Sequence, residues 1–369
     1  MKFECFSVCH YQDKGFFLSN NSEALLSYDR QSGDVTLYGL LKNGLTLVSV
    51  VIGKKIYMLP YNGNVMKVFD LETEEFEEAP FEFEADGYKL GSCSVGCAYH
   101  DEIFILCGSA NIPLCSYNVV SGQFKDRSAW RKEFFYKKGR MPEITVYRNP
   151  CIVGNDLWLA IDEPDTLLQY NMDTDQYKFW KIGDQGTIYN TVNFDGKYFW
   201  LTGDVSAIIK WNPEIGELQN IDRFPELYST KKETEWTGNF WNGIYDNGYI
   251  YYAPLNSNML IRVDVHTGKP ESILQVGNEN VCFVFSKINT EEIYMEIKSL
   301  KSGSKENAFL LDIKNGSVRE FDLEFDYGKG KCKIGNKAKK YMYLKDMYVS
   351  KFDCLEMLID LVSGTAQDD

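Results

Sequence analysis

The chain has 369 residues, of which 44% are hydrophobic and 15% aromatic, and its 53 acidic and 39 basic side chains give a net charge of −14. A field of that sign repels phosphate backbones and anionic lipid, which argues against nucleic-acid and membrane partners. No apolar run approaches the roughly 20 residues that span a bilayer. Tyrosine, phenylalanine and tryptophan favour strands, so we expect a β-rich globular protein.

The N-terminal segment does not follow the pattern of a signal peptide. Glu4 stands where the apolar stretch would continue, and no small-residue cleavage site follows. We therefore expect a cytoplasmic protein. In that compartment its ten cysteines are expected to be reduced thiols rather than a disulfide framework.

A short apolar-aromatic run recurs along the whole chain. It is expected to be the second strand of each repeat, and its central aromatic residue is expected to pack between neighbouring sheets. The runs are Gly15–Leu18, Ile56–Leu59, Ile103–Leu106, Leu157–Ala160, Tyr198–Leu201, Ile250–Ala253, Ile293–Glu296 and Met347–Ser350.

About a dozen residues after each run comes an apolar residue followed by Asp or Asn. These polar residues are Asp29, Asp70, Asn118, Asn171, Asn212, Asp264, Asp312 and Asp360, and they are separated by 41, 48, 53, 41, 52, 48 and 48 residues. Such a period is typical of propeller blades. Asp and Asn accept hydrogen bonds from backbone N–H groups two residues on, so each dipeptide is expected to open the turn between a third and a fourth strand.

The repeat predicts an all-β chain that forms a single β-propeller of four-stranded antiparallel blades over residues 1–369. Repeat counting favours eight blades. The last unit, Lys340 to Gly364, has no fourth strand, so a seven-bladed ring is the alternative. The basic stretch from Lys329 to Lys340 is expected to be a solvated loop.

The pattern of an aromatic strand followed by Tyr28-Asp29-Arg30-Gln31-Ser32-Gly33 resembles kelch-like and related bacterial propellers. This resemblance implies the architecture over nearly the whole chain. The sequence departs from kelch repeats in having no Gly-Gly pair, and it also lacks the Gly-His and Trp-Asp marks of WD40 blades.

Two long insertions are expected on the face that carries the loops from strand four to strand one and from strand two to strand three. One runs from Lys125 to Arg148 and contains Trp130; the other runs from Phe224 to Phe240 and contains Trp236. Long loops in a compact repeat are often binding elements, and the alternative is decoration without a ligand. The loops between strands two and three are rich in Asn and Asp, which suits a carbohydrate ligand but also ordinary turns.

Three asparagines form the sharpest candidate site. Asn149, Asn190 and Asn242 each lie eight residues before an aromatic run and are preceded by Arg148, Tyr189 and Trp241. Equivalent positions would bring the three amides together near the propeller axis, where their oxygens could hold Ca²⁺. The phrase Asn242 to Tyr245 resembles the calcium-binding strands of gluconolactonase-type propellers, whose implied ligands also include a Glu and an Asp that this sequence does not place. The alternative is that the amides cap loops.

Catalytic motifs are absent from the sequence. It has three histidines, no zinc-spaced Cys/His cluster and no Gly-rich phosphate loop, and no cofactor is expected apart from the Ca²⁺ just described. The first hypothesis is a binding or scaffold propeller with a protein or carbohydrate partner on the insertion-bearing face. The second is a calcium-dependent lactonase- or lyase-like enzyme.

Overall fold

The computed structural model of the chain describes residues 3–19, 24–40, 46–61, 63–85, 88–90, 92–108, 112–131, 150–230, 238–277, 279–299, 301, 305–324 and 332–335. The chain divides into two compact units. Unit 1 comprises residues 1–81, 287–292 and 321–369, and unit 2 comprises residues 82–286 and 293–320.

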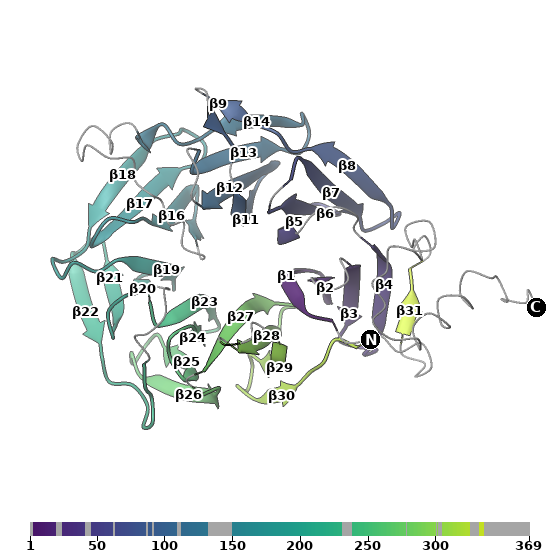
Figure 1. Cartoon of the computed structure of the whole chain (residues 1–369). Coiled ribbons are helices and arrows are strands. Elements are labelled where there is room, and N and C mark those ends of the chain that lie inside the picture. The colour runs from purple at the N-terminus through teal and green to yellow at the C-terminus, as the bar shows by residue number, and fades with distance from the viewer. Residues whose placement is uncertain are drawn as a thin grey trace, which may run out of the picture. The chain divides into compact units, whose positions relative to one another are not determined.

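Unit 1 holds two antiparallel blades (Figure 1). Blade 1 consists of β1 (Cys5–Tyr11), β2 (Lys14–Ser19), β3 (Ala24–Asp29) and β4 (Val35–Leu40), with β31 (Cys332–Ile334) added outside β4. Blade 2 consists of β5 (Thr46–Ile52), β6 (Lys55–Pro60), β7 (Val65–Asp70) and β8 (Phe76–Pro80).

Unit 2 holds five more blades and a small hairpin, β9 (Glu84–Ala85) with β10 (Tyr88–Lys89). Blade 3 consists of β11 (Ser92–Tyr99), β12 (Glu102–Gly108), β13 (Leu114–Asn118) and β14 (Gln123–Asp126). Blade 4 consists of β15 (Cys151–Val153), β16 (Asp156–Ala160), β17 (Thr166–Asn171) and β18 (Tyr177–Lys181). Blade 5 consists of β19 (Tyr189–Phe194), β20 (Phe199–Gly203), β21 (Ile208–Asn212) and β22 (Glu217–Ile221). Blade 6 consists of β23 (Phe240–Asp246), β24 (Tyr249–Pro254), β25 (Met259–Asp264) and β26 (Pro270–Gln275). Blade 7 is β27 (Asn280–Lys287), β28 (Glu292–Ser299), β29 (Lys305–Asp312), β30 (Val318–Glu320).

The described residues therefore form seven blades, and the prediction of eight is wrong. Repeat counting included the aromatic run and dipeptide between Lys340 and Gly364, a segment that lies outside the described residues. The chain just before it also differs from expectation. Cys332–Ile334, predicted to lie in a solvated loop, pairs in parallel with β4 as a fifth strand of blade 1.

The turn chemistry predicted from the Asp/Asn dipeptides is confirmed in all seven blades. In each one the side-chain oxygen accepts backbone N–H groups two or three residues on, at 2.8–3.4 Å. Four residues after the dipeptide's polar residue, the backbone has a positive φ of 56–74°. Glycine adopts that conformation without a Cβ clash and fills five of the seven positions, while Glu74 and Asp175 occupy the other two.

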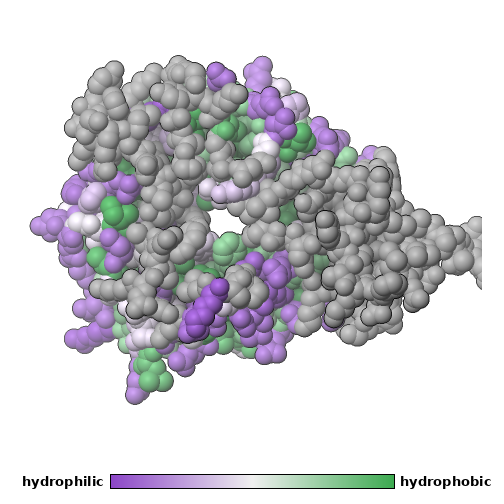
Figure 2. Space-filling model, in the orientation of Figure 1, coloured by the Kyte–Doolittle hydropathy of each residue, from purple (hydrophilic) through white to green (hydrophobic). Residues whose placement is uncertain are grey.

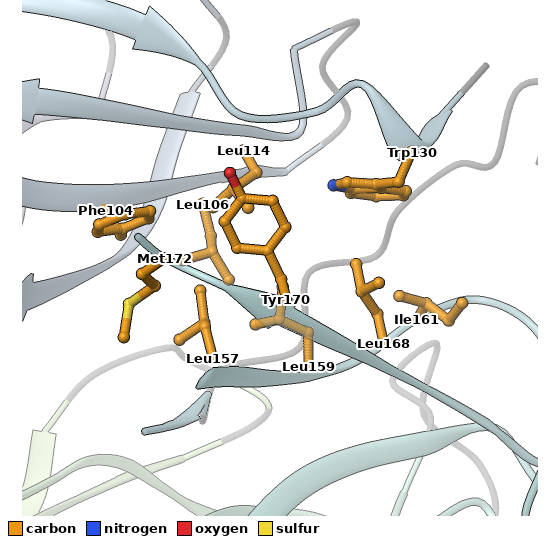
Figure 3. Close-up of a cluster of buried hydrophobic side chains, with 10 residues drawn as sticks. All are labelled: Phe104, Leu106, Leu114, Trp130, Leu157, Leu159, Ile161, Leu168, Tyr170 and Met172. Atoms are coloured by element: carbon orange, nitrogen blue, oxygen red, sulfur yellow. The ribbon is translucent and has the colours of Figure 1, made fainter. Parts of the chain in front are cut away.

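Seven of the eight predicted second-strand runs lie in the described part of the chain, where every residue of these runs except Tyr198 is buried, and within each unit they pack against the neighbouring blade. Between blades 3 and 4 the cluster joins Phe104 and Leu106 to Leu157 and Tyr170 (Figure 3). Between blades 4 and 5, Trp158 lies 4.3 Å from Phe199, centroid to centroid. One blade cannot cover both of its own faces, so stacking of successive blades provides the core.

The outer strands of blades 2 to 7 carry charged side chains. In Figure 2, hydrophilic residues gather on the outer side of blades 5 and 6, where β22 and β26 lie. Charge on such a strand discourages its free edge from pairing with other chains. Among the residues that the structure describes, no helix has both the length and the apolar character to cross a bilayer.

Candidate functional site

Asn190 and Asn242 each connect one blade to the next through the backbone. Asn190 Nδ2 donates to Phe240 O at 2.8 Å, and Asn242 Nδ2 donates to Phe285 O at 3.1 Å. Their oxygens also accept hydrogen bonds from within the chain, Asn190 Oδ1 from Thr202 Oγ1 at 2.8 Å and Asn242 Oδ1 from the Gly243 N–H at 2.7 Å. Both amides therefore link consecutive first strands.

The strand register does not make the two asparagines equivalent. Phe199 pairs with Trp211 just as Ile250 pairs with Val263, so Phe199 is the equivalent of Ile250. The sequence count had matched Tyr198 to Ile250, one residue earlier. Phe194 pairs with Phe199 and Tyr245 pairs with Ile250, with four residues between the partners in each blade, so the two first strands align from these pairs without an offset. As a result, Asn190 corresponds to Trp241.

Five first strands share a register shift near their N-terminal end. It falls between Cys5 and Ser7, Thr46 and Val48, Cys93 and Val95, Tyr189 and Thr191, and Phe240 and Asn242. A β-bulge inserts one residue and re-aims its side chain, and bulges are common beside functional sites. Asn190 and Trp241 are the bulge residues of blades 5 and 6.

Two other predicted site residues lie in the core. Trp130 is 1% exposed and packs beside Ile161 and Leu168 in the cluster of Figure 3. Tyr189 is 2% exposed, and its hydroxyl donates to Ile182 O at 3.1 Å. The remaining predicted residues, Arg148, Asn149 and Trp236, lie outside the described residues.

Trp241 and Asn242 are the described site residues that stay partly exposed, and the structure pairs Trp241 with Phe283. Their ring centroids are 5.3 Å apart at an interplanar angle of 31°. Trp241 comes from β23 of blade 6 and Phe283 from β27 of blade 7, so two consecutive first strands build the pair. We call Trp241 and Phe283 the aromatic pair.

Charged side chains buried in blade 7 adjoin the aromatic pair. Lys298 Nζ lies 4.9 Å from the Phe283 ring centroid. Glu296 is completely buried, lies 3.5 Å from Lys298 Nζ and 4.0 Å from Lys305 Nζ, and accepts a 2.8 Å hydrogen bond from the Tyr294 hydroxyl. Buried charges need such partners, because desolvation of an isolated ion is costly.

The sequence predicted only part of the aromatic pair and of this buried cluster. Trp241 was selected for its place before an asparagine, whereas Phe283 and Lys298 were not selected at all. The available signal was Glu296, a charged residue inside an otherwise apolar second-strand run.

The polar loops between strands two and three are held by the backbone. The Asp165 carboxylate accepts the N–H groups of Gly186 and Thr187 at 2.8 Å, and the Asn258 side chain accepts the Ser229 N–H at 2.9 Å. Asn256 Nδ2 donates to Gly238 O at 2.7 Å. These side chains fix the neighbouring loops between strand four and strand one.

A metal centre is not formed within the part of the chain that the structure describes, where no three His, Cys, Asp or Glu side chains are arranged to hold an ion. None of the described cysteines forms a disulfide bond, and burial raises the pKa of Cys97 and of Cys151 to about 12. A protonated thiol is a poor nucleophile, so burial lowers the reactivity of these two cysteines.

Replacing Asn190 by alanine is expected to destabilise the protein by about 2 kcal/mol, because the buried Phe240 carbonyl and Thr202 hydroxyl each lose the hydrogen bond that they make to this amide. Urea unfolding monitored by circular dichroism measures the change. The exposed Asn220 of β22 provides the control, since Asn220→Ala is expected to change stability by less than about 0.5 kcal/mol. Equal midpoints for the two variants would show that the Asn190 amide does not link blades 5 and 6.

Comparison with solved protein structures identifies the fold of the chain. No protein-family model matches the chain, and no curated protein matches its sequence. Solved structures do resemble it. YCF48 from Cyanidioschyzon merolae superposes with a TM-score of 0.59 at 8% identity, covering 81% of this chain and 94% of that one.

Two further structures give the same result. The WD40 repeats of RRP9 match with a TM-score of 0.57 at 8% identity, covering 86% of this chain and 96% of theirs. YCF48 bound to D1 peptide matches with a TM-score of 0.56 at 9% identity, covering 81% and 92%. The chain is a β-propeller. Identities this low show the fold alone, so the narrower resemblance to kelch-like propellers stays a prediction.

Proposed function

We propose that this propeller is a binding or scaffold protein that holds a peptide segment of a protein partner at the aromatic pair. The observation that carries the proposal is the partly exposed, tilted contact between the rings of Trp241 and Phe283, which two consecutive blades build at a β-bulge. Tryptophan and tyrosine dominate binding hot spots, because large rigid rings lose little conformational entropy on binding.

The surroundings of the aromatic pair support this role. Asn242 fixes the strand that carries Trp241 to Phe285 O of the next blade, and Lys298 lies against Phe283. A rigid scaffold keeps the rings in place before a partner arrives, which lowers the entropic cost of binding.

The structural neighbours agree with a peptide partner. One of them was solved with a bound peptide, and another is a WD40 repeat domain. No group of His, Cys, Asp or Glu side chains among the described residues is arranged to hold a metal ion, and the aromatic pair supports the binding hypothesis. The described cysteines form no disulfide bonds, which supports the cytoplasmic location that we propose for the protein.

The proposal is tested by panning a displayed random-peptide library on the wild-type protein and measuring the affinity of enriched peptides by calorimetry. Truncation of a hot-spot ring costs about 2 kcal/mol or more, so Trp241→Ala and Phe283→Ala are each expected to weaken binding by roughly 30-fold. The same peptides should bind Val120→Ala unchanged, since Val120 is 78% exposed in the β13–β14 turn of blade 3.

Unfolding midpoints of the variants separate binding from folding. Both rings are partly buried, so a modest loss of stability is expected for each truncation. Failure of the library to yield any peptide, or peptides that bind Trp241→Ala and Phe283→Ala as tightly as the wild type, would contradict the proposal.

A further inference from the structure

Blade 4 carries a polar pocket that has no part in the proposed peptide site. Its volume is about 280 Å³, and its lining residues come from β16, β17, β18 and the turn between the last two. They are Asp156, Gln169, Asn171, Gln176, Tyr177 and Lys178. The pocket lies at the end of the sheet where the Asn171 turn is, opposite the end that carries the loop between strands two and three.

The acidic wall of this pocket is fixed in orientation. Asp156 Oδ2 accepts the Gln169 amide at 2.7 Å, and Asp156 Oδ1 accepts the Asn171 amide at 2.8 Å. Each carboxylate oxygen can accept a further hydrogen bond, so Asp156 has capacity for two donors of a ligand. A side chain held in this way loses little freedom when a ligand binds.

A second layer of contacts holds Gln169 itself. Trp180 Nε1 donates to Gln169 Oε1 at 2.7 Å, and Lys178 Nζ lies 3.1 Å from the Trp180 ring centroid. Lys178 and Gln176 are exposed at the rim, where they offer N–H donors. The pocket therefore presents a strong acceptor inside and donors at its edge.

The charges of the lining define the chemistry that it suits. One carboxylate, Asp156, faces one ammonium group, Lys178, so the lining favours neither an anion nor a cation. Hydroxyl groups both donate and accept, which satisfies both kinds of lining group at once. The volume lies below the roughly 300–1,000 Å³ of pockets for drug-sized ligands, and the lining lacks the apolar surface of such pockets.

We propose that this pocket binds a neutral polyhydroxylated molecule of monosaccharide size. Two adjacent hydroxyls of the ligand donate to the two oxygens of Asp156, and a third accepts from Lys178. Trp180 lies directly beside the site and forms a cluster with Trp158 at 5.9 Å and Trp211 at 5.6 Å, so occupancy should change tryptophan fluorescence.

The test is saturation-transfer NMR with the full-length protein and a panel of neutral hexoses, pentoses, N-acetylated amino sugars and linear polyols. At least one sugar is expected to receive saturation, and its affinity is then measured from tryptophan fluorescence. Asp156→Asn is expected to weaken it at least 10-fold, because charge-assisted hydrogen bonds are lost. Lys178→Met is expected to weaken it several-fold while leaving the buried hydrogen bonds of Asp156 in place.

Asp184→Asn serves as the matched control, because Asp184 is an exposed carboxylate in the loop after β18, at the other end of blade 4. It should bind the sugar as the wild type does, and so should Trp241→Ala, which keeps this test independent of the peptide site. The proposal is overturned if no member of the panel receives saturation. It is equally overturned if a bound sugar keeps its affinity in both Asp156→Asn and Lys178→Met.

Discussion

Truncating Trp158 to alanine is expected to destabilise the protein by about 3–5 kcal/mol, the range for loss of a large buried aromatic side chain. Trp158 is 5% exposed and contacts rings from two blades, with Trp180 at 5.9 Å in blade 4 and Phe199 at 4.3 Å in blade 5. The loss therefore removes both a strand's own core residue and the packing between two sheets.

Urea unfolding by far-ultraviolet circular dichroism measures this effect. Trp158→Phe retains part of the ring contact and should lose clearly less stability than the alanine variant. Ile215→Ala is the surface control, since Ile215 is 66% exposed, and it is expected to stay within about 0.5 kcal/mol of the wild type. A Trp158→Ala midpoint equal to that of the control would mean that blades 4 and 5 do not pack through this ring.

Replacing Arg127 by methionine is expected to cost about 3 kcal/mol. The Arg127 side chain is 5% exposed and donates to Asp175 and to Glu102, at 2.6 Å in each case, and to Ser116 at 2.9 Å. Removing one partner of a buried ion pair leaves the others without compensation. Because Asp175 belongs to blade 4, the variant also loses a link between blades 3 and 4.

The matched control is Lys125→Met. Lys125 also contacts Asp175, at 2.7 Å, but its side chain is 55% exposed, so its loss is expected to cost less than about 1 kcal/mol. Thermal and urea midpoints of the two variants give the comparison. If Lys125→Met were the more damaging of the two, burial of Arg127 would not be the source of the stability.

The same interaction predicts a dependence on pH. Although burial of Asp175 works in the opposite direction, hydrogen bonds from Lys125, Tyr170 and Arg127 lower the pKa of its carboxyl group to about 2. A depressed pKa contributes stability above the ordinary value of 3.8, and that contribution is lost as the pH falls towards 2. The stability difference between the wild type and Asp175→Asn should therefore be constant above pH 5 and shrink between pH 4 and pH 2.

The repeated features of the fold could be predicted because they are local. An Asp or Asn accepts N–H groups two or three residues away, so the side chains of Asp29 and Asp264 reveal their turns within six letters of sequence. The aromatic runs likewise combine strand propensity with burial. The number of blades could not be predicted from local patterns, because the segment around Asp360 shows the same aromatic run and Asp dipeptide as the seven repeats that the structure describes.

The candidate site could be predicted only in part, since its geometry depends on long-range register. The strand pairing makes Phe199, and not Tyr198, the equivalent of Ile250, so Asn190 lies nine residues before the matched position whereas Asn242 lies eight before it; counting from the start of an aromatic run does not detect this offset. Trp130 shows the other difficulty. An aromatic residue in a long insertion is equally suited to bind a partner or to extend the core, and here it extends the core.

The parallel strand β31 has a consequence for self-association. An outer strand with unpaired N–H and C=O groups is a template on which a second molecule can add its own strand. On β4 that template is occupied by Cys332–Ile334, extended by the Gly335 N–H that donates to Leu37 O at 2.9 Å and by the Lys333–Asp34 ion pair at 2.5 Å. The free edge of β4 is thus covered by β31, a strand from much later in the sequence, and its three paired residues block the addition of a strand from a second molecule at this edge.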